Sequence, residues 1–160
     1  MPIFRCRRGA ICGGARPLLS SDVAYLLDTN VISELRRRRP HPAVLAWLTG
    51  IPDVDLHLST VTLGELQAGV ELTREQDPIK AAELEAWIEQ VAHTYKLIPM
   101  DDRCFREWAR LMHRRSDDLI EDAMIAATAQ VYGLLLVTRN TRDFAALGLK
   151  TLNPFAPGAS

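Results

Sequence analysis

Cysteine and long apolar runs are both scarce in this sequence of 160 residues. The three cysteines are Cys6, Cys12 and Cys104, and no two of them have the C-x-x-C spacing of a metal or redox pair. We therefore expect neither a disulfide framework nor a zinc site, and we place the protein in the reducing cytoplasm. No apolar run approaches the roughly 18 residues of a membrane-spanning helix, so no membrane association is predicted.

Positive charge is scarce outside the N-terminal segment. The first 21 residues contain Arg5, Arg7, Arg8 and Arg16 and no acidic residue. The rest of the chain therefore has 15 basic and 20 acidic residues, a formal net charge of −5. Nucleic-acid-binding domains usually carry a basic surface. A function on nucleic acid would thus have to depend on a local site.

Composition divides the chain into three parts. Residues 1–21 are rich in arginine and are interrupted by Gly9, Gly13 and Gly14, which break the amphipathic helix that a transit peptide would form. We predict a disordered extension there, rather than a targeting signal. One domain is predicted over residues 22–155, followed by a tail at 156–160. The sequence is 48% hydrophobic and long enough to bury a core.

Strands and helices are predicted to alternate through this domain. Apolar runs predict strands at 23–27, 55–59, 96–100, 134–138 and 149–153. Helical stripes with their start and stop signals predict helices at 30–39, 41–50, 60–72, 78–95, 102–115 and 119–133, with a short turn at 140–147. This order indicates an α/β fold, with helices on both faces of a mainly parallel sheet of about five strands.

Several polar residues fall at the same end of the predicted strands. Asp28 ends the first strand, Glu65 lies in the first turns of the helix after the second, and Asp122 opens the helix leading into the fourth. Thr138 and Asn140 follow that fourth strand. Right-handed crossovers bring all of these positions to one edge of a parallel sheet, where open α/β sheets build their sites.

Two of the carboxylates also have a purely structural interpretation. Asp28 or Thr29 could cap the helix that follows. Thr62 and Glu65 have the spacing of a capping box. Taken singly, neither position therefore proves a functional site.

Asp122 is harder to explain structurally, because it shares a helical stripe with the apolar positions Ile125, Ala126 and Ala129 and should face the sheet. An inward carboxylate must be paired or must bind a cation. Its neighbour Glu121 is interpreted instead as the capping-box partner of Asp118.

Carboxylates gathered at one edge repel each other unless a cation lies between them. Oxygen donors without nearby Cys or His favour a hard ion, Mg²⁺ or in its place Mn²⁺. Such an ion can activate water and stabilise charge on a phosphodiester. No G-x-S-x-G motif and no Cys/His pair at a suggestive spacing offers another nucleophile.

Four sequence blocks resemble the PIN-domain family, in particular the VapC/FitB-type toxins of type II toxin–antitoxin systems. They are "LLDTNVISEL", "LSTVTLGELQAGV", "EDAMIAATAQVYGLLLVTRNTRDF" and "LNPF", in the family's order from about Ala24 to Phe155. The resemblance implies an α/β/α sandwich that acts as a Mg²⁺-dependent endoribonuclease on RNA. It also implies a cognate antitoxin that competes with Mg²⁺ for the site, and a homodimer formed by the helical hairpin of residues 63–95.

The resemblance also assigns roles to the polar edge. Asp28, Glu65 and Asp122 would surround the metal, and Thr29, Asn30 and Thr138 would orient the carboxylates and water.

One position departs from the family pattern, because the fourth acidic residue is replaced by Asn140. Asp143 could supply the missing charge through water. Alternatively it caps the short helix that begins near Phe144, and we favour this second interpretation.

The run Arg36–Arg39 has an RNA-binding interpretation and a simpler one. We favour a solvated helix end, because cations suit the negative pole of a helix and the run lies one helix length from the site.

Two other functions compete with the nuclease hypothesis. A phosphatase of the haloacid-dehalogenase type needs a second aspartate where Asn30 stands, which argues against it. A PIN-like or flavodoxin-like binding module without activity is supported only by Asn140.

Overall fold

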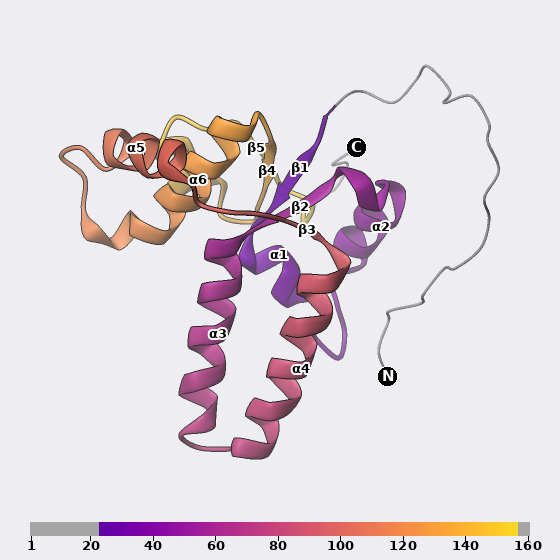
Figure 1. Cartoon of the computed structure of the whole chain (residues 1–160). Helices are drawn as coiled ribbons and strands as arrows, with labels where there is room; N and C mark the ends of the chain where they lie inside the picture. The colour runs from indigo at the N-terminus through magenta and orange to yellow at the C-terminus, as the bar shows by residue number, and fades with distance from the viewer. Residues whose placement is uncertain (1–22, 157–160) are drawn as a thin grey trace.

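The computed structural model describes residues 23–156, so the predicted extension at 1–21 and most of the tail at 156–160 lie outside the described residues. A sheet of five parallel strands runs through the centre, in the order β3-β2-β1-β4-β5. The strands are β1 (Tyr25–Leu27), β2 (Leu56–Ser59), β3 (Lys96–Ile98), β4 (Leu135–Val137) and β5 (Thr151–Leu152). The predicted sheet is confirmed, and the first strand lies at its centre (Figure 1).

Helices connect the strands and cover both faces of the sheet (Figure 1). They are α1 (Thr29–Glu34), α2 (Pro42–Gly50), α3 (Thr60–Arg74), α4 (Pro78–Thr94), α5 (Asp102–Leu111), α6 (Ile120–Tyr132) and α7 (Thr141–Ala146). Gly133 ends α6 with a φ of 64°, a left-handed conformation that glycine adopts without steric cost. None of the helices within residues 23–156 is long and apolar enough to cross a membrane.

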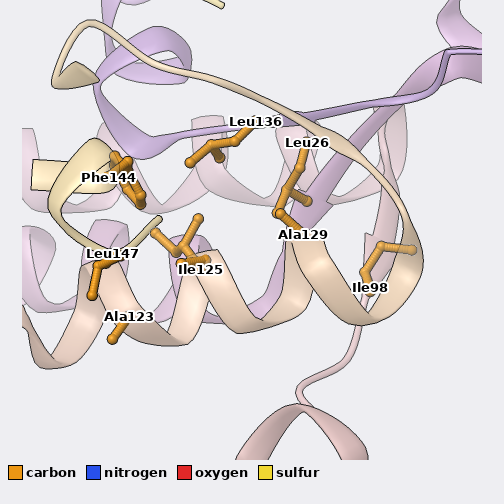
Figure 2. Close-up of a cluster of buried hydrophobic side chains, with 9 residues drawn as sticks. Leu26, Ile98, Ala123, Ile125, Ala129, Leu136, Phe144 and Leu147 are labelled. Atoms are coloured by element: carbon orange, nitrogen blue, oxygen red, sulfur yellow. The ribbon is translucent and has the colours of Figure 1, made fainter. Parts of the chain in front are cut away.

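One face of the sheet is covered by α5, α6 and α7. Leu26 of β1 and Leu136 of β4 project from the sheet and pack against Ile125 and Ala129 of α6 and Phe144 of α7 (Figure 2). These side chains are at most 1% exposed. The small alanines along α6 let this helix lie close to the strands, which fixes the start of α6 next to the ends of β1 and β4.

The opposite face is covered by α1 and α2 and by the sheet end of α4. Leu27, Leu58 and Val137 lie on this side, because successive residues of a strand point to opposite faces. Val31 of α1 and Val91 of α4 pack on them. Strands β1 and β4 are therefore packed between two apolar layers, one on each face of the sheet.

Helices α3 and α4 form a hairpin that projects away from the sheet (Figure 1). Val70, Ala81 and Ile88 form a separate small core between them. The predicted helix start at residue 78 is confirmed, and the preceding Asp77 caps it, since its side chain accepts a hydrogen bond of 3.0 Å from the backbone N–H of Lys80. The hairpin thus has its own packing and does not depend on the sheet along its whole length.

The helix predicted at residues 30–39 is wrong at its C-terminal end. Helix α1 stops at Glu34, and Arg36–Arg39 follow it as an exposed turn. The buried Glu34 carboxylate accepts a hydrogen bond of 3.0 Å from the backbone N–H of His41 and pairs with Arg37 at 3.2 Å. These contacts tie both ends of the turn together, so the arginines are not a helix end.

Candidate metal centre

Asp28 lies directly after β1 and is only 4% exposed. It is the N-cap of α1, as one of the two structural interpretations predicted, and its Oδ1 accepts a hydrogen bond of 2.7 Å from the backbone N–H of Thr29. Its other oxygen, Oδ2, accepts hydrogen bonds from the Asn30 amide and from the Thr138 hydroxyl, the latter at 2.6 Å. Asp28 therefore combines the cap with a network that reaches across to β4.

Thr138 connects the ends of β1 and β4. Its hydroxyl donates to Asp28 and accepts from the Asn30 amide at 3.0 Å and from the backbone N–H of Asn140 at 2.9 Å. The Asn30 side-chain oxygen in turn accepts from the backbone N–H of Arg139 at 3.0 Å. The sequence does not predict this hydrogen bond, because the backbone N–H of almost any residue at position 139 could donate it. The one donor and both acceptor positions of the Thr138 hydroxyl are therefore used, and this fixes the orientation of the Asp28 carboxylate.

Glu65 lies in α3, and its Oε2 accepts a hydrogen bond from the hydroxyl of Thr29, the first residue of α1. The predicted Thr62–Glu65 capping box is wrong. Ser59 is the N-cap of α3, and its Oγ accepts from the backbone N–H of Val61 at 3.1 Å. Ser59 already ends β2, so the helix starts three residues earlier than a Thr62 cap would require. Glu65 is thereby left available for the polar edge.

Asp122 lies half-buried in the first turn of α6, next to the corner after β4. The Asn140 amide lies 3.5 Å from Asp122 Oδ2 and donates a hydrogen bond of 2.7 Å to Asp143 Oδ2. The favoured interpretation of Asp143 as a helix cap is wrong. Asp143 lies inside the first turn of α7, and its carboxylate is bound to Asn140 instead.

The predicted capping box of Asp118 and Glu121 is also wrong. Asp118 lies in a 3₁₀ turn (Asp117–Leu119), where its carboxylate accepts a hydrogen bond of 3.0 Å from the Ser116 hydroxyl. Leu119 precedes α6 without a side-chain cap. The exposed Glu121 adds only its charge to the polar edge.

The three carboxylates are electrostatically coupled. Burial, followed by the charges of Asp28, Asp143 and Glu121, raises the pKa of Asp122 to about 6. Burial also raises the pKa of Glu65, the Thr29 hydrogen bond opposes this, and the charges of Asp28 and Asp122 add to it. The pKa of Asp28 is raised by burial, despite its hydrogen bonds to Thr138, Thr29 and Asn30. The fold therefore holds negative charges together at an energetic cost.

Comparison with known proteins identifies the family of this chain. A family model described as the PIN domain matches residues 25–149, which is most of the chain. The chain belongs to the PIN-domain family. Its five-stranded parallel sheet with helices on both faces agrees with the fold that the resemblance implied.

Two curated relatives match almost their whole length to this PIN domain. It is 37% identical over 143 residues to the VapC ribonuclease Y4jK of Sinorhizobium fredii, covering 82% of this chain and 98% of the relative. It is 36% identical over 137 residues to the plasmid stability protein StbB of Pseudomonas syringae pv. tomato, covering 81% and 97%.

A solved structure supports the same relationship. The crystal structure of FitAcB from Neisseria gonorrhoeae superposes with a TM-score of 0.72 at 33% identity. The match covers 82% of this PIN domain's chain and 98% of the other.

The polar edge of this PIN domain offers oxygen donors only. Within residues 23–156, no group of three or more His, Cys, Asp or Glu side chains gathers tightly enough to hold a metal ion by itself. Glu65 is engaged by Thr29, and Asp122 faces the Asn140 amide. Mg²⁺ keeps several waters and uses only one or two protein carboxylates. The donor set of Asp28 and Asp122 therefore fits a hydrated Mg²⁺ ion, and metal binding by all three carboxylates stays a prediction.

The raised pKa of Asp122 predicts a pH-dependent stability of this PIN domain in EDTA. The folded state binds the Asp122 proton more tightly than the unfolded state, so the stabilisation is complete below about pH 4 and is lost as pH rises through about 6. Asp122→Asn has no such loss. The difference in the free energy of unfolding between the variant and the wild type should therefore shift in favour of the variant by about 1 kcal/mol when the pH is raised from 4.5 to 7.5, after allowance for solvent screening.

Urea unfolding at both pH values measures this difference, and Asp118→Asn, an exposed aspartate in the preceding turn, is the control. A gain that is equal at both pH values would contradict the raised pKa.

Proposed function

We propose that this PIN domain is a Mg²⁺-dependent endoribonuclease and the toxin of a type II toxin–antitoxin pair. Similarity to a VapC ribonuclease over nearly its full length supports a nuclease of this class. The observation that carries the proposal is the gathering of Asp28, Glu65 and Asp122 at one sheet edge, where the charge of Asp28 raises the pKa of both Glu65 and Asp122 and the charge of Asp122 raises that of Glu65. A site that concentrates negative charge in this way suits a cation and the phosphate that the cation attracts.

Each residue has a distinct part in this proposal. A bound divalent ion would neutralise the carboxylates, activate a water molecule and stabilise the charge that develops on the phosphodiester. Asp28 and Asp122 would hold it from β1 and α6. Asn30 and Thr138 keep the Asp28 carboxylate in one orientation, through the hydrogen bonds described above. Glu65, with a raised pKa and a hydrogen bond from Thr29, would add a third carboxylate from α3.

Metal removal is the direct test. Purified protein in about 5 mM Mg²⁺ or Mn²⁺ should cleave single-stranded RNA, and an excess of EDTA should lower the rate to background. Without the cation nothing offsets the repulsion between the carboxylates and the phosphate. Added Mg²⁺ should restore the rate, which separates metal removal from denaturation. Cleavage that persists at full rate in EDTA would contradict the proposal.

The competing phosphatase hypothesis loses further support from Asn30. Its amide donates hydrogen bonds to Asp28 and Thr138, and its oxygen accepts from the backbone of Arg139. A residue with all these groups engaged, and with no acidic proton, does not serve as the general acid that such a phosphatase needs. The binding-module hypothesis predicts the absence of cleavage in Mg²⁺, so the same assay tests it.

The partners of the proposed toxin follow from its charge and its hairpin. A similar solved structure, with a TM-score of 0.61 at 27% identity, is a toxin–antitoxin complex from Klebsiella pneumoniae. We expect a cognate antitoxin here that places a basic side chain near the carboxylates, because opposite charges attract across an interface. We also expect a homodimer through the α3–α4 hairpin, where Leu72 and Ile79 are 66% and 77% exposed. Exposed apolar side chains at this position suit an interface.

A further inference from the structure

A groove leads from the polar edge along the α3–α4 hairpin. It has a volume of about 270 Å³ and is lined by α1, the turn after it, α3 and α4. Thr29 and Glu65 line its end at the carboxylates, and Thr73 and Lys80 line it near the hairpin turn. From Glu65 to Thr73 the groove follows α3 for two turns, or about 12 Å. It is therefore continuous with the proposed active site and extends well beyond it.

The charge of the groove changes along its length. Glu65 is the one acidic side chain that lines it, and Arg36 and Lys80 are the basic ones. Neither Arg36 nor Lys80 forms an ion pair with a carboxylate in the part of the chain that the structure describes. Two unpaired cations in a domain of net charge −5 mark a local preference for an anion.

Arg36 is held at this groove by the early end of α1. The helix has six residues, about 9 Å, so the turn that follows it lies beside the hairpin. The Arg36 guanidinium lies 5.9 Å from the centre of the Trp87 ring on α4, within the range of a cation–π contact. Glu34 fastens the rest of the turn through Arg37 and His41. Arg36 is thus solvent-exposed, as the sequence predicted, and also lines the groove.

The groove is lined by apolar side chains and by hydroxyl groups. The apolar ones are Leu66, Val70, Leu84 and Ile88, of which Val70 and Ile88 are buried, and the hydroxyl groups belong to Ser33 and Thr73. A single RNA strand has the complementary features, because its bases have apolar faces, its 2′-hydroxyls form hydrogen bonds and its phosphates are anionic. A basic antitoxin segment suits the groove less well, because Arg36 and Lys80 would repel it.

We propose that this groove binds the RNA strand on one side of the scissile phosphate, with Arg36 and Lys80 contacting backbone phosphates. The inference rests on the proposed nuclease function and adds to it the path of the substrate. Neither cation touches the reacting phosphate, so both act by binding and positioning.

The test is binding of a fluorescein-labelled single-stranded RNA of about 12 nucleotides, followed by fluorescence anisotropy in EDTA. The double variant Arg36→Ala/Lys80→Ala should bind at least about tenfold more weakly than the wild type. The slope of log K against log salt should decrease in magnitude by about 1.4, or about 0.7 per lost phosphate contact. The control Arg38→Ala/Lys150→Ala removes two exposed cations that do not line the groove, and should leave the slope unchanged.

Cleavage assays with two substrate lengths provide an independent readout. In Mg²⁺ the double variant should have a raised KM for the long RNA and an unchanged rate on a dinucleotide, whose single phosphodiester is the one that is cleaved, so that no phosphate remains for Arg36 or Lys80. Lys80→Glu alone should show the same pattern. It leaves the Arg36–Trp87 contact intact, so a folding defect does not explain a weaker affinity.

The outcomes separate this inference from the proposed function. If the wild type cleaves RNA and the double variant binds it with the same affinity and salt slope, the groove does not carry RNA. If the wild type cleaves nothing, yet RNA binding still falls in the double variant, the nuclease proposal fails and the groove assignment stands. If RNA binding is unchanged but the double variant no longer co-purifies with the protein encoded by the neighbouring gene, the groove binds a peptide and the inference is wrong.

Discussion

Asp122→Asn is expected to lower the rate of Mg²⁺-dependent RNA cleavage by at least about 100-fold. The substitution keeps the size of the side chain and removes one of the two carboxylates best suited to hold the ion. A metal ion contributes several kcal/mol of charge stabilisation in a transition state, and each 1.36 kcal/mol corresponds to a factor of ten in rate. The rate should be measured under single-turnover conditions, so that product release does not mask the effect. Isothermal titration with Mn²⁺ should show a weaker affinity in the same variant.

Glu121→Gln is the matched control for this experiment. Glu121 is the preceding residue of α6, it is exposed, and it also contributes to the raised pKa of Asp122. Removing its charge should change cleavage only slightly, because its side chain points to solvent and not to the polar edge. Equal losses in both variants would mean that only overall charge matters. That outcome would contradict a specific role for Asp122.

Thr138→Val should have the second-largest effect, on both activity and stability. Valine has nearly the shape of threonine but forms none of the hydrogen bonds that the fully buried hydroxyl makes with Asp28, Asn30 and the backbone of Asn140. Leaving buried partners unsatisfied costs about 1–3 kcal/mol, or roughly 2–4 °C in Tm for each 1 kcal/mol. Cleavage should fall by about 10- to 100-fold, as expected when a residue that orients a metal ligand is lost.

Thr138→Ser distinguishes the hydroxyl from its surroundings. Serine retains the donor and both acceptor positions and loses only one methyl group. Its activity should stay within about threefold of the wild type, with a modest loss of stability. Thermal melting and the cleavage assay measure the two effects separately. If serine is as inactive as valine, the packing of the methyl group matters and the hydrogen-bond network does not.

The sequence predicted the strands and the edge at which the carboxylates meet, because both follow from local patterns. An apolar run that ends at Asp28 and another that ends before Thr138 are visible without any tertiary information. The rule of right-handed crossovers then places their ends side by side, and the pairing of β1 with β4 agrees with it.

The errors arose where a distant or preceding residue decides the local structure. The predicted helix over 30–39 did not take into account the hydrogen bond from the backbone of His41 to Glu34, which closes the segment across Pro40. The predicted cap at Thr62 overlooked Ser59, a good cap that also belonged to a good strand. Asp143 was assigned to a helix cap, because its contact with Asn140 depends on the shape of the corner after β4. Contacts of this kind require the tertiary fold.

The central position of β1 has a consequence for protein synthesis. The hydrogen bond between Asp28 and Thr138 joins residues 110 positions apart. Strand β1 lies between β2 and β4, so one of its two edges stays unpaired until β4 has been synthesised. A nascent chain leaves the ribosome from its N-terminus, so Asp28 emerges long before the strand that orients it. The last strands to be made complete both the sheet and the polar edge. The proposed nuclease would therefore acquire its complete site only after β4 has left the ribosome, and not while the earlier part of the chain is being made among ribosomal RNA.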